Sequence, residues 1–373
     1  MGKWEPVNGK KVTMRNGQFR NWGFVEKDIF LAAGPCSAES ESQVLRVAHA
    51  LAGSDVGFLR AGIWKPRTRP GSFEGVGRKG LAWLARARSE TGLRVGTEVA
   101  EPSHVEACLA YDLDILWIGA RTTTNPFSVQ AIADALRGVD IPVLIKNPMN
   151  EDIGLWIGAL ERLSNAGITK LGAIHRGVGS SLEMRYRNAP VWRLPIELMR
   201  RMPELPILCD PSHICGKADL IAMVAQEAMD LLFDGLMVEV HPDPAHALSD
   251  AAQQLKPDQF FEMISGLKHP HERGGSSGFV RRLNTLREQV DQLDSHLLEM
   301  LGRRMEIVRE MGTLKAEQNI STLQPHRWKE ILEDRVKKGS SLGFGPDFVI
   351  NLMQIIHEEA IRRQEADRLG DSD

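Results

Sequence analysis

The chain has 373 residues, and its 42% hydrophobic content is enough for one large domain plus a smaller one. Its 46 basic and 49 acidic residues leave a net charge of -3, so no overall field draws the protein to nucleic acid or to an anionic membrane. The sequence starts without an apolar signal region and has no run of about 18 apolar residues, so we expect a cytoplasmic protein with no membrane partner.

Residues 1–28 read as an N-terminal extension. Two Asn-Gly pairs, Asn8-Gly9 and Asn16-Gly17, flank the segment KKVTMR and predict turns around a short hairpin. We expect this hairpin to cap the floor of the domain that follows.

Residues 29–266 alternate apolar runs with segments of helical length. The eight runs are 30–37, 57–64, 93–99, 115–121, 142–148, 169–177, 206–213 and 235–242. Strands that alternate with helices indicate a parallel sheet, and near-continuous apolar character indicates that both of its faces are covered. Eight such units match a (β/α)₈ barrel, an α/β fold. The alternative is an open doubly wound sheet, but neither GxGxxG nor GxxxxGK[ST] occurs in the sequence.

Each of the eight runs begins with apolar residues and ends with charged or reactive ones. Examples are AAGPCS, VGTE, IGAR, LIKNP, AIHRG, LCDPSH and MVEVHP. A barrel gathers its active-site groups at the carboxyl ends of its strands. The pattern therefore predicts one site at that face.

Four of these strand-end residues form a candidate metal set: Cys36, His213, Glu239 and Asp250. Taken singly, a cysteine after Gly-Pro is usually a small buried residue, and a histidine in DPSH is usually a turn or core residue. Their expected position on one rim favours the functional interpretation. Thiolate, imidazole and carboxylates together suit a divalent transition ion better than magnesium.

A second set at the same strand ends is cationic. Its members are Arg60, Lys65, Arg67, Arg69, Arg121, Lys146 and Arg176. On a helix such residues would form a solvated face, but a desolvated cation at an inward strand end is costly unless an anion meets it. The set therefore predicts a highly anionic substrate, because Arg suits bidentate phosphate or carboxylate binding.

Nearly the whole barrel carries a chain of motifs in a specific order. GPCSAES, RAGIWKPRTRPGSF, GTE, IGAR, IKNP, HRG, DPSH and EVHPDPAHALSDAAQQL resemble the 3-deoxy-heptulosonate 7-phosphate synthase family, whose branch also contains the 3-deoxy-octulosonate 8-phosphate synthases. The segment Lys65-Pro66-Arg67-Thr68 is similar to the heptulosonate form, which takes erythrose 4-phosphate. Cys36 matches the metal-dependent members of the family.

The resemblance implies a condensation and a role for each matched residue. Phosphoenolpyruvate would be held by Lys65, Arg121, Lys146 and Arg176 beside the Gly119-Ala120 backbone, while Arg67 and Thr68 would meet erythrose 4-phosphate and Arg60 would complete the cationic wall. The metal would polarise the aldehyde, with Mn²⁺ as the first candidate and Fe²⁺, Co²⁺ or Zn²⁺ as alternatives, and Lys65 would act as a catalytic group. One departure is Asn147-Pro148, where many members have Arg-Gly.

The composition changes after the barrel. Residues 267–279 contain LKHPHERGGSSG, which is typical of a flexible linker. From residue 280 the apolar residues follow helical spacing, which predicts one long helix and then two more over 325–338 and 346–367. A helical domain this small has little core of its own, so association with a second copy is expected.

The long helix places cations along one face. Arg304 and Lys315 are eleven residues apart, which puts them about 20° apart in azimuth and about 16 Å along the axis. Arg287 precedes Arg304 by about 25 Å of straight helix, too far to share a small ligand within one chain. Arg287 would therefore serve a partner's site.

Residues 281–366 resemble the all-helical chorismate mutase family, an interlocked homodimer with sites built from both chains. The match rests on LREQVDQLDSHLLEMLGRRMEIVREMGTLK, QPHRW and QIIHEEAIRRQ. It assigns chorismate binding to Arg287 of the partner, Arg304, Lys315, Gln324, Arg327, Ala360 and Gln364, with Lys315 and Gln364 beside the ether oxygen. Gln324 stands in place of a usual Asp, and Ala360 in place of a usual Ser.

Two other interpretations of the helical domain remain. It could be a dimerisation module with a solvated basic face, or a sensor that binds chorismate or prephenate and throttles the barrel. If both domains act in one pathway to aromatic amino acids, feedback by prephenate or a later product is expected.

Overall fold

The computed structural model describes residues 18–24, 29–65, 71, 73–179, 185–269 and 276–369. The chain divides into two compact units, residues 1–272 and residues 273–373, and each is described by itself. Of the helices described, none has the length and apolar character needed to cross a membrane.

The first unit is a closed barrel of eight parallel strands, as the apolar runs predict. The strands are β1 (Phe30–Gly34), β2 (Val56–Arg60), β3 (Val95–Val99), β4 (Ile115–Ile118), β5 (Val143–Lys146), β6 (Leu171–His175), β9 (Ile207–Cys209) and β10 (Gly235–Glu239). Each strand pairs with its neighbours in sequence order, and β1 closes on β10 with Gly34 opposite Glu239. The carboxyl ends of all eight strands therefore meet on one face.

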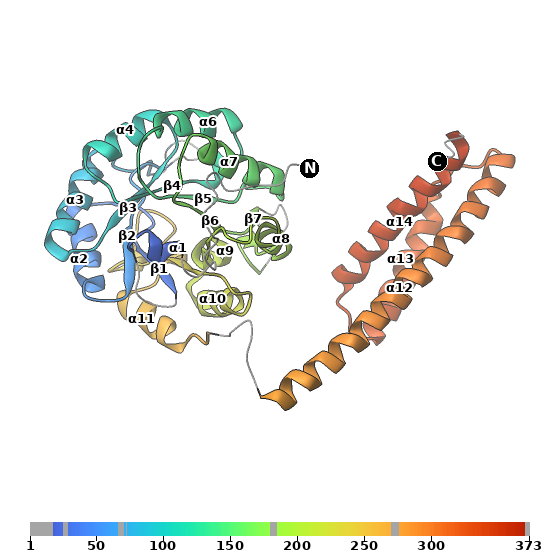
Figure 1. The fold of residues 1–373 in the computed structure, drawn as a ribbon. Helices are drawn as coiled ribbons and strands as arrows, with labels where there is room; N and C mark the ends of the chain where they lie inside the picture. The colour runs from blue at the N-terminus through green and yellow to red at the C-terminus, as the bar shows by residue number, and fades with distance from the viewer. Residues whose placement is uncertain are drawn as a thin grey trace. The chain divides into compact units, whose positions relative to one another are not determined.

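Helices surround the strands (Figure 1). They are α2 (Glu41–Leu51), α3 (Lys79–Thr91), α4 (Pro102–Ala110), α6 (Pro126–Ala135), α7 (Ile153–Asn165), α8 (Arg193–Arg201), α10 (Ile221–Asp230) and α11 (Pro257–Gly266). Local sequence sets several starts, because the side chains of Ser40, Asn125 and Asp152 accept hydrogen bonds from the first-turn amides of α2, α6 and α7. Short helical turns follow three strands: α5 (Ala120–Thr123) after β4, α9 (Pro211–Cys215) after β9, and η3 (Pro244–His246) with η4 (Ala251–Gln253) after β10.

Alternate strand residues fill the inside of the barrel. This inner core contains Phe30, Phe58, Ile115, Trp117, Leu144, Ile174, Leu208 and Met237, all buried. The floor is covered by α1 (Gln18–Asn21), whose Phe19 stacks on Phe30 with ring centroids 4.2 Å apart and touches Trp22 edge to face. The hairpin expected around KKVTMR lies outside the described residues.

A short antiparallel ribbon interrupts the connection from β6 to α8. It consists of β7 (Val178–Gly179) and β8 (Asn188–Ala189), with Val178 opposite Ala189. Gly177 begins the ribbon with φ +77°, and a Cβ there would lie 2.9 Å from the carbonyl oxygens of Asn188 and Ala189. Glycine is therefore required at this bend.

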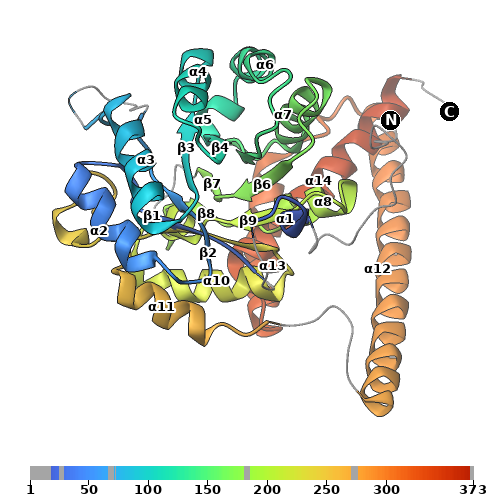
Figure 2. The same cartoon turned by 60° about the vertical axis from the view of Figure 1, so that its left-hand side comes forward.

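Within residues 276–369, the second unit contains helices and no strand. It consists of α12 (Ser277–Glu317), α13 (Pro325–Ser341) and α14 (Pro346–Leu369), close to the three helices predicted. Figure 2 shows α12 as one unbroken rod. Helix α14 packs on both others: Gln364 lies against Gly312 of α12, and His357 stacks on Trp328 of α13 at 4.0 Å. Few side chains of this unit are buried, among them Val308, Val349 and Ala360.

Candidate active sites

Three of the four predicted metal ligands meet at the carboxyl end of the barrel. Cys36 follows β1, Glu239 ends β10 and Asp250 precedes η4, and one ligand atom of each lies within 4.8 Å of the others. Cys36 Sγ is 3.3 Å from Asp250 Oδ2. The fourth, His213 on α9, has Nε2 3.7 Å from Glu239 Oε1. Thiol, imidazole and carboxylates in this arrangement fit a divalent transition ion.

The surroundings of Cys36 keep its thiol protonated unless an ion binds. Burial, and after it the charge of Glu239, raises the pKa of the Cys36 thiol to about 12, although the Lys65 ammonium acts against this. The Lys65 Nζ donates to Cys36 Sγ at 2.9 Å. Burial also lowers the pKa of His213, which keeps its imidazole in the neutral form that binds metals. Metal binding would release the thiol proton and take its place.

Arg60 forms the inner wall beside this cluster. It is 1% exposed, and its Nη1 donates to Glu239 Oε1 at 3.1 Å while its Nη2 donates to the Cys36 carbonyl at 3.0 Å. Arg60 is thus committed to a metal ligand and a backbone oxygen. Arg60 thus holds Glu239 and the Cys36 backbone from a buried position, and it is not exposed to a substrate.

Asp210 links a predicted cation to a predicted ligand, and the sequence interpretation gave it no role. Its buried carboxylate lies 2.8 Å from Lys146 Nζ and 2.8 Å from His213 Nδ1. Asp210 is also the N-cap of α9, because its side chain accepts a hydrogen bond from the His213 backbone amide. The motif DPSH contained this residue, but nothing in the motif showed that Asp210 would orient both neighbours.

The turn after β4 carries the next group of predicted residues. A Cβ at Gly119 would lie 2.1 Å from Glu98 Oε1, so a larger residue there would displace the Glu98 carboxylate. Glu98 in turn accepts from Trp117 Nε1 at 2.9 Å. Ala120 starts α5, and Arg121 is exposed on the same short helix.

Arg176 follows β6 and is 6% exposed. Its Nη1 donates to Asn188 Oδ1 at 2.8 Å, and none of the described carboxylates forms an ion pair with it. Burial lowers the pKa of Arg176 to about 10; Asp210 opposes this shift, while the charges of Arg187 and Arg121 add to it. The Arg176 guanidinium is thus buried without a carboxylate partner among the described residues, and an anion would stabilise it.

Arg187 is a site residue that the sequence interpretation missed. It precedes β8, and its Nη1 donates to Asp250 Oδ1 at 2.8 Å and to Gln253 Oε1 at 2.7 Å. Its only sequence signal was its place in a polar stretch, RYRN, between two recognisable strands. The predicted residues Arg67, Thr68 and Arg69 lie outside the described residues.

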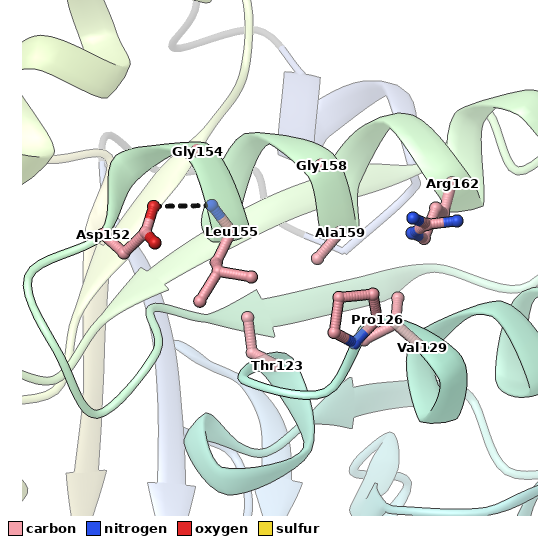
Figure 3. A pocket seen from close by; sticks show the side chains of 9 residues that line it. All are labelled: Thr123, Pro126, Val129, Asp152, Gly154, Leu155, Gly158, Ala159 and Arg162. Carbon is pink, nitrogen blue, oxygen red and sulfur yellow. Dashed lines mark hydrogen bonds between the residues drawn. The ribbon is translucent and has the colours of Figure 1, made fainter.

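A separate hollow of about 330 Å³ lies between α6 and α7. Figure 3 shows Thr123, Pro126 and Val129 on one side and Leu155, Gly158 and Ala159 on the other. Its charged residues are already engaged, since Asp152 accepts from the Leu155 amide and Arg162 donates to Gln130. The hollow offers a ligand little polar recognition and contains none of the predicted site residues.

The helical unit gathers part of its predicted site. Arg304 and Lys315 extend from α12, and Gln364 from α14 lies against Gly312. The buried atoms Arg304 Nη1, Gln364 Oε1 and His357 Nε2 have no hydrogen-bond partner among the described residues. Burial, and then the charge of Arg335, lowers the pKa of Arg304. A polar ligand bound here would supply the partners that these buried atoms lack.

The remaining predicted residues of this unit are less engaged. Ala360 is buried beside Gln364, whose Nε2 donates to its carbonyl at 3.3 Å. Gln324 precedes α13 as its N-cap, and Arg327 is exposed with an ion pair to Glu330 at 3.0 Å. Arg287 lies on the same continuous α12 as Arg304, so one chain does not bring these two together.

Two family models match the chain. The DAHP synthetase I family matches residues 25–272, and chorismate mutase type II matches residues 286–365. The two matches fall on the two compact units.

Individual relatives agree with these families. A phospho-2-dehydro-3-deoxyheptonate aldolase of Thermotoga maritima is 35% identical over 64% of this chain and 68% of its own length. A 2-dehydro-3-deoxyphosphooctonate aldolase of Syntrophotalea carbinolica is 28% identical over 62% of this chain and 86% of its own. Among solved structures, the Thermotoga maritima DAHP synthase is similar with a TM-score of 0.58 and 34% identity, over 64% of this chain and 67% of that one.

Proposed function

The chain belongs to the DAHP synthetase I family and ends in a chorismate mutase type II domain, and we propose that it catalyses one reaction in each unit. The barrel condenses phosphoenolpyruvate with erythrose 4-phosphate to 3-deoxy-D-arabino-heptulosonate 7-phosphate and inorganic phosphate. The helical domain rearranges chorismate to prephenate. The convergence of four ligand side chains with a cationic wall at the barrel's carboxyl face is the observation that carries the first assignment.

In the condensation, C3 of phosphoenolpyruvate attacks the aldehyde carbon, water adds at C2 and phosphate leaves. Arg176, Arg121 and Lys146 hold the carboxylate and phosphate of phosphoenolpyruvate beside the Gly119 backbone. Asp210 holds Lys146 in place, and Lys65 donates a hydrogen bond to Cys36 Sγ. Holding two anions side by side against their repulsion is the main task of these residues.

Cys36, His213, Glu239 and Asp250 would hold a divalent ion, with Mn²⁺ as our first choice. When bound, the ion supplies Lewis-acid polarisation of the aldehyde oxygen. Lys65, whose Nζ contacts Cys36 Sγ, would donate a proton to the oxygen that develops negative charge. Arg67 and Thr68 are proposed to receive the phosphate of the aldose, as the sequence Lys65-Pro66-Arg67-Thr68 implies.

Substitution at Lys146 tests the phosphoenolpyruvate site. Lys146→Gln should raise KM for phosphoenolpyruvate at least tenfold and leave KM for erythrose 4-phosphate within about threefold, because one ion-paired contact of about 1.5 kcal/mol or more is lost. The exposed Lys170→Gln, paired with Asp140 on the surface, is the control. Equal effects on both KM values would contradict the assignment of Lys146.

In the rearrangement no proton moves, so the site only has to compress the substrate and stabilise the ether oxygen. Arg304 and the partner's Arg287 would bind the two carboxylates, with Lys315 and Gln364 at the ether oxygen and Arg327 and Gln324 at the rim. The buried unpaired atoms of Arg304 and Gln364 support this role. Ala360 contributes shape only, because it lacks a hydroxyl.

The surface of α12 supports the proposal of a partner chain. Leu286, Val290, Leu293, Leu297 and Leu298 are between 42% and 69% exposed, an apolar stripe that a second copy would cover. We therefore propose a homodimer through the helical domain, with each site completed by the partner's Arg287.

Mixing protomers tests the shared site. Arg287→Ala and Arg304→Ala should each abolish most mutase activity alone, and their mixture should recover activity through hybrid dimers with one intact site. Lack of recovery after verified exchange of protomers would contradict the two-chain site.

The sensor interpretation predicts a different result in the same assay. If the helical domain only senses its ligand, the intact chain binds prephenate but does not turn over chorismate. We propose that it does both, and that prephenate or a later aromatic product inhibits the condensation in the cytoplasm. Condensation rates that stay constant with prephenate, tyrosine and phenylalanine would remove the feedback proposal.

A further inference from the structure

The two carboxylates proposed as metal ligands, Asp250 and Glu239, each use one oxygen toward the cluster and the other toward a neighbouring side chain. Asp250 turns Oδ2 toward Cys36, while its Oδ1 accepts from Arg187. Glu239 has Oε1 near His213, while its Oε2 accepts from Gln253 Nε2 at 2.7 Å. Arg60 also donates to Glu239 Oε1, so groups outside the cluster engage one oxygen of Asp250 and both oxygens of Glu239. These groups restrict how each carboxylate could turn toward a metal.

The contacts to Asp250 Oδ1 and to Glu239 Oε2 both depend on Arg187. Its Nη1 reaches Asp250 directly and Gln253 at 2.7 Å, so one guanidinium holds one carboxylate and braces the amide that holds the other. Asp250 also has φ +48°, a left-handed conformation that a non-glycine residue adopts only when its surroundings hold it. The contact to Arg187 is part of what holds it.

The next residue, Asn188, faces the anion site. Its Oδ1 accepts from Arg176 Nη1 at 2.8 Å, and its Nδ2 donates to the His213 carbonyl at 2.6 Å. Asn188 therefore joins the cation proposed for phosphoenolpyruvate to the backbone of a metal ligand. The buried Arg176 guanidinium has no carboxylate partner among the described residues, so its hydrogen bond to Asn188 Oδ1 orients it.

The ribbon that carries these two residues is seated firmly. The Arg187 amide donates to the Cys215 carbonyl at 3.3 Å, and Gly216 makes room for it, since a Cβ there would lie 2.5 Å from Arg187 Cβ. At the other end the His175 ring contacts the Pro190 carbonyl. The Arg187 contacts fix the ribbon to α9, the element that carries His213, and the Pro190 contact fixes it to β6.

We propose that Arg187 and Asn188 are positioning residues that tie the metal-ligand carboxylates to the cation that receives phosphoenolpyruvate. The inference rests on the proposed condensation and extends it to two residues that need not touch either substrate. Arg187 orients the carboxylates of the proposed metal site, and Asn188 orients the Arg176 guanidinium.

Binding measurements on the intact chain test this division. Arg187→Met should raise the Kd for Mn²⁺ by about 10-fold to 100-fold and change the Kd for phosphoenolpyruvate, measured without metal, by less than about threefold. Arg187→Lys should recover part of the Mn²⁺ affinity. Asn188→Ala should raise the metal-free Kd for phosphoenolpyruvate about tenfold. Both constants come from calorimetry, with circular dichroism to show that each variant is folded.

Arg185→Met is the matched control, since Arg185 lies two residues away and contacts Met223 instead of the site. Variants at 187 and 188 that bind both Mn²⁺ and phosphoenolpyruvate like this control would overturn the proposal. An unsubstituted chain that binds neither ligand would instead overturn the proposed condensation. A folded Arg187→Met variant that loses both affinities equally would contradict the division of roles.

Discussion

Replacing His175 with glutamine should make the barrel less sensitive to acid. His175 ends β6, next to the site residue Arg176, and is fully buried. Its ring lies near Trp156 and Trp192, with centroids 6.3 Å and 5.5 Å away. Burial is the main reason why the pKa of His175 falls to about 4.

The magnitude follows from the two pKa values. In the unfolded chain an imidazole titrates near pH 6.5, so between about pH 6.5 and 4 the unfolded state binds more protons than the folded one. The contribution of a neutral His175 to the free energy of unfolding is therefore fully present above that pH range, and it is lost as pH falls through the range. For His175 alone the loss from about pH 7.5 to about pH 5 is about 2 kcal/mol. For a barrel of this size this corresponds to roughly 4 to 8 °C in Tm.

Urea unfolding at the two pH values, followed by tryptophan fluorescence, measures this loss. The His175→Gln variant should lose about 2 kcal/mol less stability on acidification than the unsubstituted chain, whatever its stability at neutral pH. His246→Gln is the control, because that side chain is 83% exposed. An unchanged pH dependence in His175→Gln would show that His175 is not held neutral by burial.

Three further predictions address the site and the assembly. Gly119→Ala should raise KM for phosphoenolpyruvate at least tenfold, because the alanine Cβ would collide with Glu98. The control is Gly158→Ala, which should leave this KM unchanged because the space around its Cβ is open. Arg60→Met should destabilise the metal-free barrel by about 3 to 5 kcal/mol in urea unfolding, because Glu239 stays buried without its arginine partner. Adding Mn²⁺ should recover part of this stability. An unchanged free energy of unfolding would contradict the importance of this pair. Leu293→Glu should shift the protein toward monomer in sedimentation analysis while Gln292→Glu should not, and an unchanged dimer would exclude this stripe as the interface.

The barrel was predictable because its signal is repeated. Eight apolar runs, each ending in polar residues, leave few alternatives once both sheet faces are covered. The meeting of Cys36, His213 and Glu239 at one face was predictable for the same reason, since each lies at or after the end of a recognisable strand. Asp250 was assigned through the motif that surrounds it, and the structure brings it to Cys36.

The missed residues act through contacts that only the closed barrel creates. Asp210 is 64 residues from Lys146 in sequence, and Arg187 is 63 residues from Asp250. Neither pairing has a local pattern, because a loop residue carries no periodicity. In the helical domain, spacing on α12 placed Arg304 and Lys315 on one face, but only packing against α14 brings Gln364 beside Gly312.

One experiment tests most directly whether a single chain carries two independent sites. The intact protein is assayed for condensation of phosphoenolpyruvate with erythrose 4-phosphate and for conversion of chorismate to prephenate, before and after treatment with a chelator and again after adding Mn²⁺. Chelation should abolish the condensation, Mn²⁺ should restore it, and the rearrangement should continue at the same rate throughout. Full condensation activity in the chelated protein, or absence of chorismate turnover in all three samples, would contradict the account.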